Sequence, residues 1–75
     1  MTTFERVRDV ICNELGIDAG EVESNSKLED LGVDSMDRAS LMLELETVLG
    51  IEIPEDDAMK LRRVYQIVDY VDSRS

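Results

Sequence analysis

Residues 28–37 read Leu28-Glu29-Asp30-Leu31-Gly32-Val33-Asp34-Ser35-Met36-Asp37, a glycine turn that leads directly into a helix. Asp34 or Ser35 can cap the start of that helix. The hydroxyl of Ser35 projects from the helix end, where another enzyme can reach it. The free backbone N–H groups and the dipole at this end favour a bound phosphate. An isolated serine here is usually an ordinary cap, so the spacing alone leaves both interpretations open.

The helix that follows is expected over Ser35–Leu49 and ends at Gly50. It is apolar on two faces, whereas a helix of a four-helix bundle needs only one buried stripe. One stripe consists of Leu41, Met42, Leu45 and Leu49, and the other of Met36, Ala39 and Leu43. The second stripe indicates either a fully buried helix or a partly exposed surface that partners contact, and we favour the exposed surface.

The rest of the chain predicts three more helices. An apolar face repeating at three- and four-residue steps predicts a helix over Thr3–Leu15, stopped by Gly16. Pro54 and Glu55 can open a short helix over Glu55–Lys60, and Val64–Asp72 forms the last one.

Residues 17–34 form a long connection between the first two helices. Its scattered apolar residues are expected to pin it to the core; they are Ile17, Val22, Leu28, Leu31 and Val33. We therefore predict one all-α domain over residues 1–75, a small four-helix bundle with three principal helices and one short helix.

Charge narrows the functional classes. Eighteen acidic residues against eight basic ones give a net charge of −10. Such a chain is repelled by nucleic acid and anionic membranes and attracted to basic protein surfaces, although the charge can also serve solubility alone. Membrane insertion is not expected, because no segment approaches the length of a membrane span. No signal peptide is recognisable, so we expect a cytoplasmic location.

Catalytic side chains are scarce. The chain has no histidine, and its single cysteine, Cys12, excludes an intramolecular disulfide. A Ser–His nucleophile pair is therefore impossible, no calcium loop of the EF-hand spacing is present, and a chain of 75 residues has little room for a cleft. We predict a protein without catalytic residues or a metal site.

The wider pattern resembles the acyl carrier proteins over nearly the whole chain. The stretch 28–37 is similar to that family's acidic–Leu–Gly–x–Asp–Ser–Leu core. Further similarities follow in the family's order at Val10-Ile11, Leu15-Gly16, Leu45-Glu46, Ile51-Glu52-Ile53-Pro54 and Val68-Asp69-Tyr70-Val71. Met36 stands where the family most often has leucine, which preserves volume and apolarity.

The resemblance implies a carrier function. Ser35 matches the serine to which a phosphopantetheinyl transferase attaches 4'-phosphopantetheine from coenzyme A. Its thiol would carry an acyl group for fatty-acid, polyketide or related synthesis, and type II members shelter the acyl chain among their helices. A monomer is the family's expectation. Partners would be acyltransferases, synthases or ligases with basic docking patches. The residues expected to contact them are Asp34, Met36, Asp37, Arg38, Ala39, Leu43, Glu46 and Asp56.

Two alternatives remain open. The cargo could be an amino acid, as in peptidyl or D-alanyl carriers, or the chain could be a structural or regulatory subunit that keeps the fold without turning over cargo. The strong acidity favours acyl cargo, and the complete setting of Ser35 argues against a purely structural role.

Three departures from the family pattern bear on the pathway. Arg38 places a positive charge in the first turn of the second helix, while Ser40 and Met59 replace acids. We interpret the resulting less negative surface as a sign of a dedicated pathway rather than general fatty-acid synthesis. The alternative is drift in the lineage with matching changes in the partners.

Overall fold

Four α-helices build the molecule in the computed structural model, which describes residues 1–74. They are α1 (Thr3–Leu15), α2 (Ser35–Leu49), α3 (Glu55–Ala58) and α4 (Val64–Arg74), with 3₁₀ turns at Ala19–Glu21 and Glu29–Leu31. The described part of the chain forms no strand, so the predicted all-α fold is confirmed. Ser75 lies outside the described residues.

The ends of α1 and α2 agree with the sequence patterns. Thr2 caps α1 through a capping box with Glu5, and Asp34 caps α2. Gly16 and Gly50 end these helices in left-handed conformations, with φ of 68° and 67°. Glycine adopts such conformations without the steric cost of a Cβ atom.

The predicted ends of the other two helices were wrong by two residues each. α3 ends at Ala58 rather than Lys60, because the chain tightens there: the amides of Lys60 and Leu61 bond three residues back, to Asp57 and Ala58. α4 continues past Asp72 to Arg74, whose guanidinium lies 3.9 Å from the centroid of the Tyr70 ring. A cation in the last turn also favours the helix dipole.

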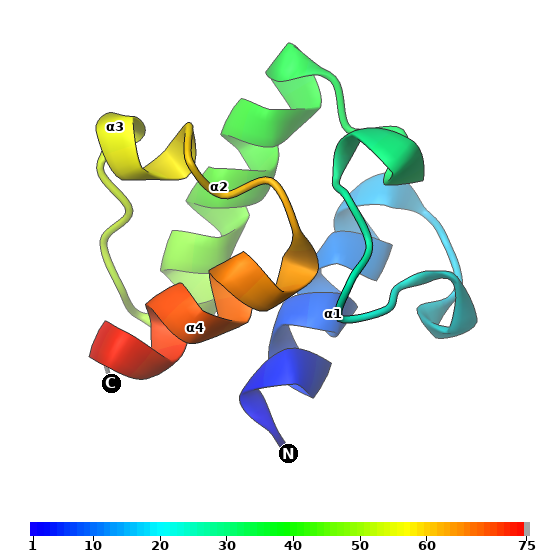
Figure 1. Cartoon of the computed structure of the whole chain (residues 1–75), viewed down its shortest axis with the longest axis horizontal. Coiled ribbons are helices and arrows are strands. Elements are labelled where there is room, and N and C mark those ends of the chain that lie inside the picture. Colours follow the sequence, from blue (N-terminus) through cyan, green and yellow to red (C-terminus); the bar gives the residue numbers. More distant parts are fainter. Residues whose placement is uncertain (75) are drawn as a thin grey trace.

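One core joins the three long helices. α1 packs against both α2 and α4. Each long helix contributes side chains that are fully buried, and the largest in the core are Ile11, Leu28, Leu41, Leu45, Ile67, Val7 and Val64. The short α3 has no fully buried side chain. In Figure 1 it lies beside α2 at the upper left, away from α1.

The long connection is fixed to the core, as predicted. Val22, Leu28 and Val33 are buried. Backbone hydrogen bonds add to this: the Leu28 amide donates to the Arg62 carbonyl at 2.9 Å, and the Val64 amide donates to Ser26 at 3.0 Å. The sequence pattern did not predict this pairing. The connection therefore holds the segment that leads into α2.

The capping box of α1 yields a test of stability. We expect Thr2→Ala to lower the free energy of unfolding by about 1 kcal/mol, because the amide of Glu5 loses its partner hydroxyl. Hydrogen bonds from Thr2 also lower the pKa of Glu5 below its ordinary value. Because the pKa of Glu5 is lower in the folded chain than in the unfolded chain, the ionised carboxylate stabilises the fold at any pH above the unfolded pKa. This stabilisation is lost as the pH falls through the folded pKa. Urea denaturation at neutral and at acidic pH measures the loss of stability in Thr2→Ala and its dependence on pH. Thr2→Ser is the control, because it keeps the hydroxyl.

Candidate functional site at the start of α2

Ser35 is the first residue of α2, and its side chain is exposed. Asp34, not Ser35, provides the cap, since its carboxylate accepts a hydrogen bond from the Asp37 amide at 2.8 Å. Gly32 turns the chain into the helix with a φ of 95°. Within residues 1–74 the hydroxyl of Ser35 has no hydrogen-bond partner. The hydroxyl is therefore accessible and, within these residues, available to react.

A groove of about 290 Å³ runs between α2 and α3, with Ser35 among its lining residues. The others are Arg38, Ala39, Met42, Leu43, Glu46, Ile53, Glu55, Ala58 and Met59. Ser35 and Glu46 are separated by about three helical turns, or roughly 16 Å along α2. The groove thus leads from the hydroxyl along one face of the helix.

The second apolar stripe of α2 borders this groove. Met36 is 81% exposed and Leu43 65%, and Ala39 is also exposed. Met59 adds a further apolar side chain from the other wall, 65% exposed. The predicted exposure of the stripe is confirmed, and its contact with partners stays a prediction.

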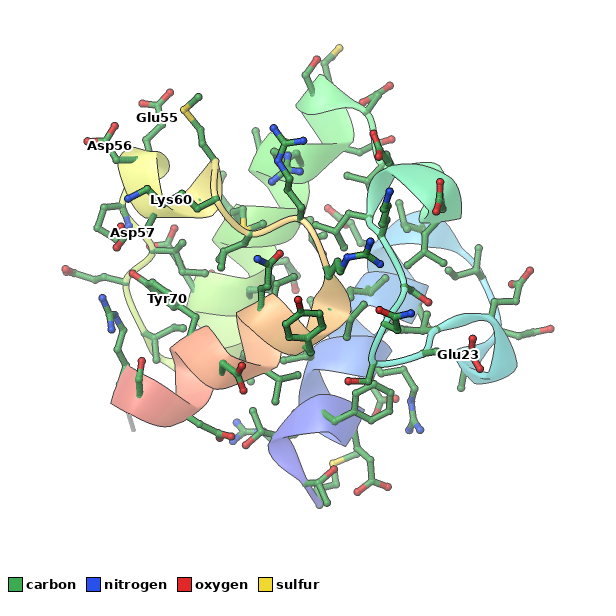
Figure 2. The ribbon with its side chains drawn as sticks, in the orientation of Figure 1. Glu23, Glu55, Asp56, Asp57, Lys60 and Tyr70 are labelled. Carbon is green, nitrogen blue, oxygen red and sulfur yellow. The ribbon has the colours of Figure 1, made fainter. Side chains whose placement is uncertain are left out.

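The acids of α3 differ in their surroundings. Glu55 and Asp56 are exposed and project away from the molecule (Figure 2). Asp57 instead accepts a hydrogen bond from the Tyr70 hydroxyl at 2.8 Å and lies 3.6 Å from Arg74. Burial and this carboxylate raise the pKa of Tyr70. Among the described residues, the side chains of Glu55 and Asp56 make no hydrogen bond or ion pair, unlike that of Asp57.

Arg38 points from α2 toward the end of α3. Its guanidinium is half-buried and donates to the Ala58 carbonyl at 3.0 Å and the Leu61 carbonyl at 2.8 Å. The sequence pattern treated this residue only as a positive charge on the partner surface. A contact with partners stays a prediction, and the structure adds a bond to α3.

The remaining predicted contact residues divide between groove and surface. Ala39, Leu43 and Glu46 line the groove with Ser35, whereas Asp34, Met36, Asp37 and Asp56 do not. Sequence reasoning missed Met42, Ile53 and Ala58 as groove residues. Met42 is 5% exposed and Ile53 6%, so their apolar pattern indicated only core packing. No signal in the sequence could have separated these two roles.

The sole cysteine lies away from this site. Cys12 is half-buried on α1, and burial raises the pKa of its thiol. At neutral pH it therefore stays protonated and poorly nucleophilic.

Asp34 links the site to helix stability. We expect Asp34→Ala to lower the free energy of unfolding by about 1 kcal/mol, because the Asp37 amide loses its acceptor. Asp34→Asn keeps an acceptor oxygen and should stay within about 0.5 kcal/mol of the parent chain. Urea denaturation of both variants separates the contribution of the cap to stability from the contribution of the negative charge. Equal stability of the alanine variant and the parent would contradict the assigned cap.

The site fits a phosphate ester on Ser35. The hydroxyl is free, and the end of α2 presents backbone N–H groups and a favourable dipole to an attached phosphate. The groove beside it offers apolar walls to whatever the phosphate carries. These residues would accept 4'-phosphopantetheine without rearrangement of the cap.

Known proteins are similar to this chain in sequence over nearly its whole length. The family model described as a phosphopantetheine attachment site matches residues 5–71. The acyl carrier protein of Campylobacter jejuni strain RM1221 is 45% identical over 74 residues, covering 97% of this chain and 96% of that protein. The acyl carrier protein of C. jejuni subsp. doylei is 43% identical over the same shares.

A full-length match of this kind extends well beyond the Asp-Ser core, which alone would be weak evidence. It includes the connection, the short helix and α4 as well as the start of α2. The chain therefore belongs to the acyl carrier protein family, with 4'-phosphopantetheine as its covalently attached cofactor.

Proposed function

We propose that Ser35 bears the phosphopantetheine arm and that the chain presents acyl groups to synthesis enzymes without catalysing a reaction itself. The observation that carries this proposal is the exposed, uncommitted hydroxyl of Ser35 beside an apolar groove. The absence of histidine from the chain supports the non-catalytic part, because no Ser–His pair can form.

Attachment forms one phosphodiester bond. The Ser35 oxygen bonds to the phosphorus next to pantetheine in coenzyme A, the pyrophosphate bond breaks, and adenosine 3',5'-bisphosphate leaves. A base of the transferase takes the serine proton. When bound, the arm supplies a thiol that holds an acyl group as a thioester.

The chain's own residues position Ser35 and protect the acyl chain. Asp34 fixes the first turn of α2 and so the direction of Ser35. The walls of the groove at Met42, Ile53 and Ala58 offer apolar surface to an acyl chain. Burial of such a chain in the groove would shield it from water.

Partner recognition is assigned to the rim of the groove. The exposed side chains of Met36 and Leu43 supply apolar contacts at short range. Asp34, Glu55 and Asp56 are exposed acids that steer the chain toward basic patches. Such steering raises association rates and weakens as salt increases.

The pathway we propose is a dedicated one rather than general fatty-acid synthesis. Ser40 is exposed on α2, and Met59 is 65% exposed on the groove wall, both at positions where an acid was expected. A partner adapted to this surface needs more apolar and less basic area. Equal loading and elongation of this chain and a housekeeping carrier by basal fatty-acid synthase enzymes would refute a dedicated pathway.

Loading tests the function itself. The purified chain is incubated with coenzyme A, Mg²⁺ and a broad-specificity phosphopantetheinyl transferase, and its intact mass is measured. We expect a gain of one phosphopantetheinyl group, with fragment ions placing it on Ser35. Offering the loaded protein to acyl ligases and to amino-acid adenylation enzymes then identifies the cargo class. No mass gain with two unrelated transferases would refute the carrier function.

A further inference from the structure

The short helix α3 forms one wall of the groove but has little of its own to hold it in place. It contains four residues, and none is fully buried. An isolated helix of this length is unstable in water, because nucleation costs more than so few hydrogen bonds return. Contacts from neighbouring helices must therefore hold α3.

One contact comes from α4, on the side away from the groove. The Tyr70 hydroxyl donates to Asp57 at 2.8 Å, and Arg74 stacks on the Tyr70 ring while lying 3.6 Å from the same carboxylate. Figure 2 shows Asp57 and Tyr70 next to each other. Neither Tyr70 nor Arg74 lines the groove beside Ser35.

The second contact comes from α2, on the groove side. Arg38 donates to the carbonyls of Ala58 and Leu61 with one nitrogen, at 3.0 and 2.8 Å. A guanidinium bonded to carbonyls at a helix end is a charge-assisted contact, stronger than a neutral hydrogen bond. It joins the first turn of α2 to the last residue of α3 and to the segment that follows.

The two hydrogen bonds made by Arg38 lie where the groove meets the core. Arg38 and Ala58 line the groove, whereas Leu61 is 6% exposed and belongs to the core. Met42, at 5% exposed, lies in both. An apolar chain that extended from the groove toward Leu61 would pass beside the carbonyls of Ala58 and Leu61 that accept from Arg38.

We propose that Arg38 latches α3 to α2 and thereby limits the length of acyl chain that the groove can bury. The inference rests on the proposed function, since it concerns the cargo of the same site. Arg38 acts here as a positioning residue: it holds the wall of the groove and need not touch the cargo. Loss of the latch extends burial to longer chains.

The latch is tested first in the unmodified protein. Arg38→Met removes the donors but keeps a long apolar stem, so the groove is not left open. The amides of residues 58–61 are the ones that donate backbone hydrogen bonds here. We expect them to exchange hydrogen about tenfold faster in the variant, as loss of hydrogen bonds from a charged group predicts. Amides of α1 should be unchanged. Exchange at residues 58–61 as slow as in the parent chain would overturn the latch.

Arg62→Met provides the matched control. Arg62 is exposed and lines a small cavity of about 30 Å³ together with Arg38, so the variant removes the same charge from the same neighbourhood. Its side chain makes no hydrogen bond within the described chain. We expect the amides of residues 58–61 to exchange as slowly as in the parent chain. Exchange as fast as in Arg38→Met would assign the effect to charge and overturn the latch.

The limit on length is tested in the loaded protein. Parent and Arg38→Met chains carry a series of saturated acyl groups from butyryl to palmitoyl. The measurement is the gain in melting temperature over the non-acylated loaded form of the same variant. We expect this gain to stop rising at a shorter acyl group in the parent than in Arg38→Met. A purely structural role would lower all melting temperatures without moving that point, and would overturn the limit on length.

The two proposals fail separately. If no transferase loads Ser35, the proposed function is refuted, while hydrogen exchange in the unmodified protein still decides whether Arg38 latches α3. If loading succeeds and the gain in melting temperature stops rising at the same acyl length in the parent and in Arg38→Met, the carrier function stands and the inference about Arg38 is overturned.

Discussion

Ser35→Ala is expected to abolish attachment of the arm completely. The hydroxyl oxygen is the atom that would bond to phosphorus, and alanine has no replacement for it. No gain in intact mass should be detectable after prolonged incubation with coenzyme A, Mg²⁺ and a transferase, while the parent chain converts fully. The effect is all or none because it removes a reacting atom rather than weakening a contact.

The variant should remain folded, which makes the result interpretable. Ser35 is exposed, its hydroxyl has no hydrogen-bond partner within residues 1–74, and Asp34 keeps the cap. We expect its free energy of unfolding to change by less than about 0.5 kcal/mol. Ser40→Ala, at an exposed serine on the same helix, is the matched control and should load normally. A mass gain in Ser35→Ala would place the attachment elsewhere and refute the assignment.

The sequence predicted the parts of the fold that depend on local patterns. The three long helices start where predicted, because Thr3, Ser35 and Val64 begin segments with clear apolar periodicity. Ser35 was predicted as the attachment residue from a glycine turn, a helix cap and a resemblance over the whole chain, and the attachment itself stays a prediction. The signals for the turn and for the helix ends lie within a few residues of the features that they predict.

Contacts between distant segments could not be predicted in this way. The bonds from Arg38 to Ala58 and Leu61 span 20 and 23 residues. Their formation depends on where α3 ends, and that end was itself predicted two residues too late. A single sequence shows a positive charge at position 38 but not the carbonyl oxygens that meet it.

Burial was predicted only where one face of a helix decides it. For α2, two apolar faces left both a central and a partly exposed helix possible, and the structure exposes Met36 and Leu43 while burying Leu41 and Leu45. Met42 lies in the core and also lines the groove. Apolar periodicity does not distinguish a side chain that only packs from one that also faces a cavity.

Leu28→Ala is expected to be the most destabilising substitution that we consider. Leu28 is 0% exposed, and its loss removes buried methyl groups and leaves a cavity in the connection between α1 and α2. Such substitutions cost about 2–5 kcal/mol. Small domains lie toward the lower part of the usual range of about 5–15 kcal/mol, so a large share of the total stability is lost. Urea denaturation followed by far-UV circular dichroism measures the change.

Leu43→Ala is the matched control, because it makes the same substitution at a leucine that is 65% exposed. We expect a change below about 0.5 kcal/mol there, together with weaker binding to partner enzymes through the exposed stripe. A Leu28→Ala chain as stable as the parent would show that the connection is not part of the cooperative core.

The position of Leu28 in the chain extends the consequence to the site. Its amide donates to the Arg62 carbonyl, and the residues after it turn at Gly32 into the cap at Asp34 and the helix that begins with Ser35. Loosening this segment frees the start of α2 to fray. We therefore expect Leu28→Ala to load more slowly than the parent chain at a temperature where both remain mostly folded. Equal loading rates would mean that the cap at Asp34 holds Ser35 in place without help from the connection.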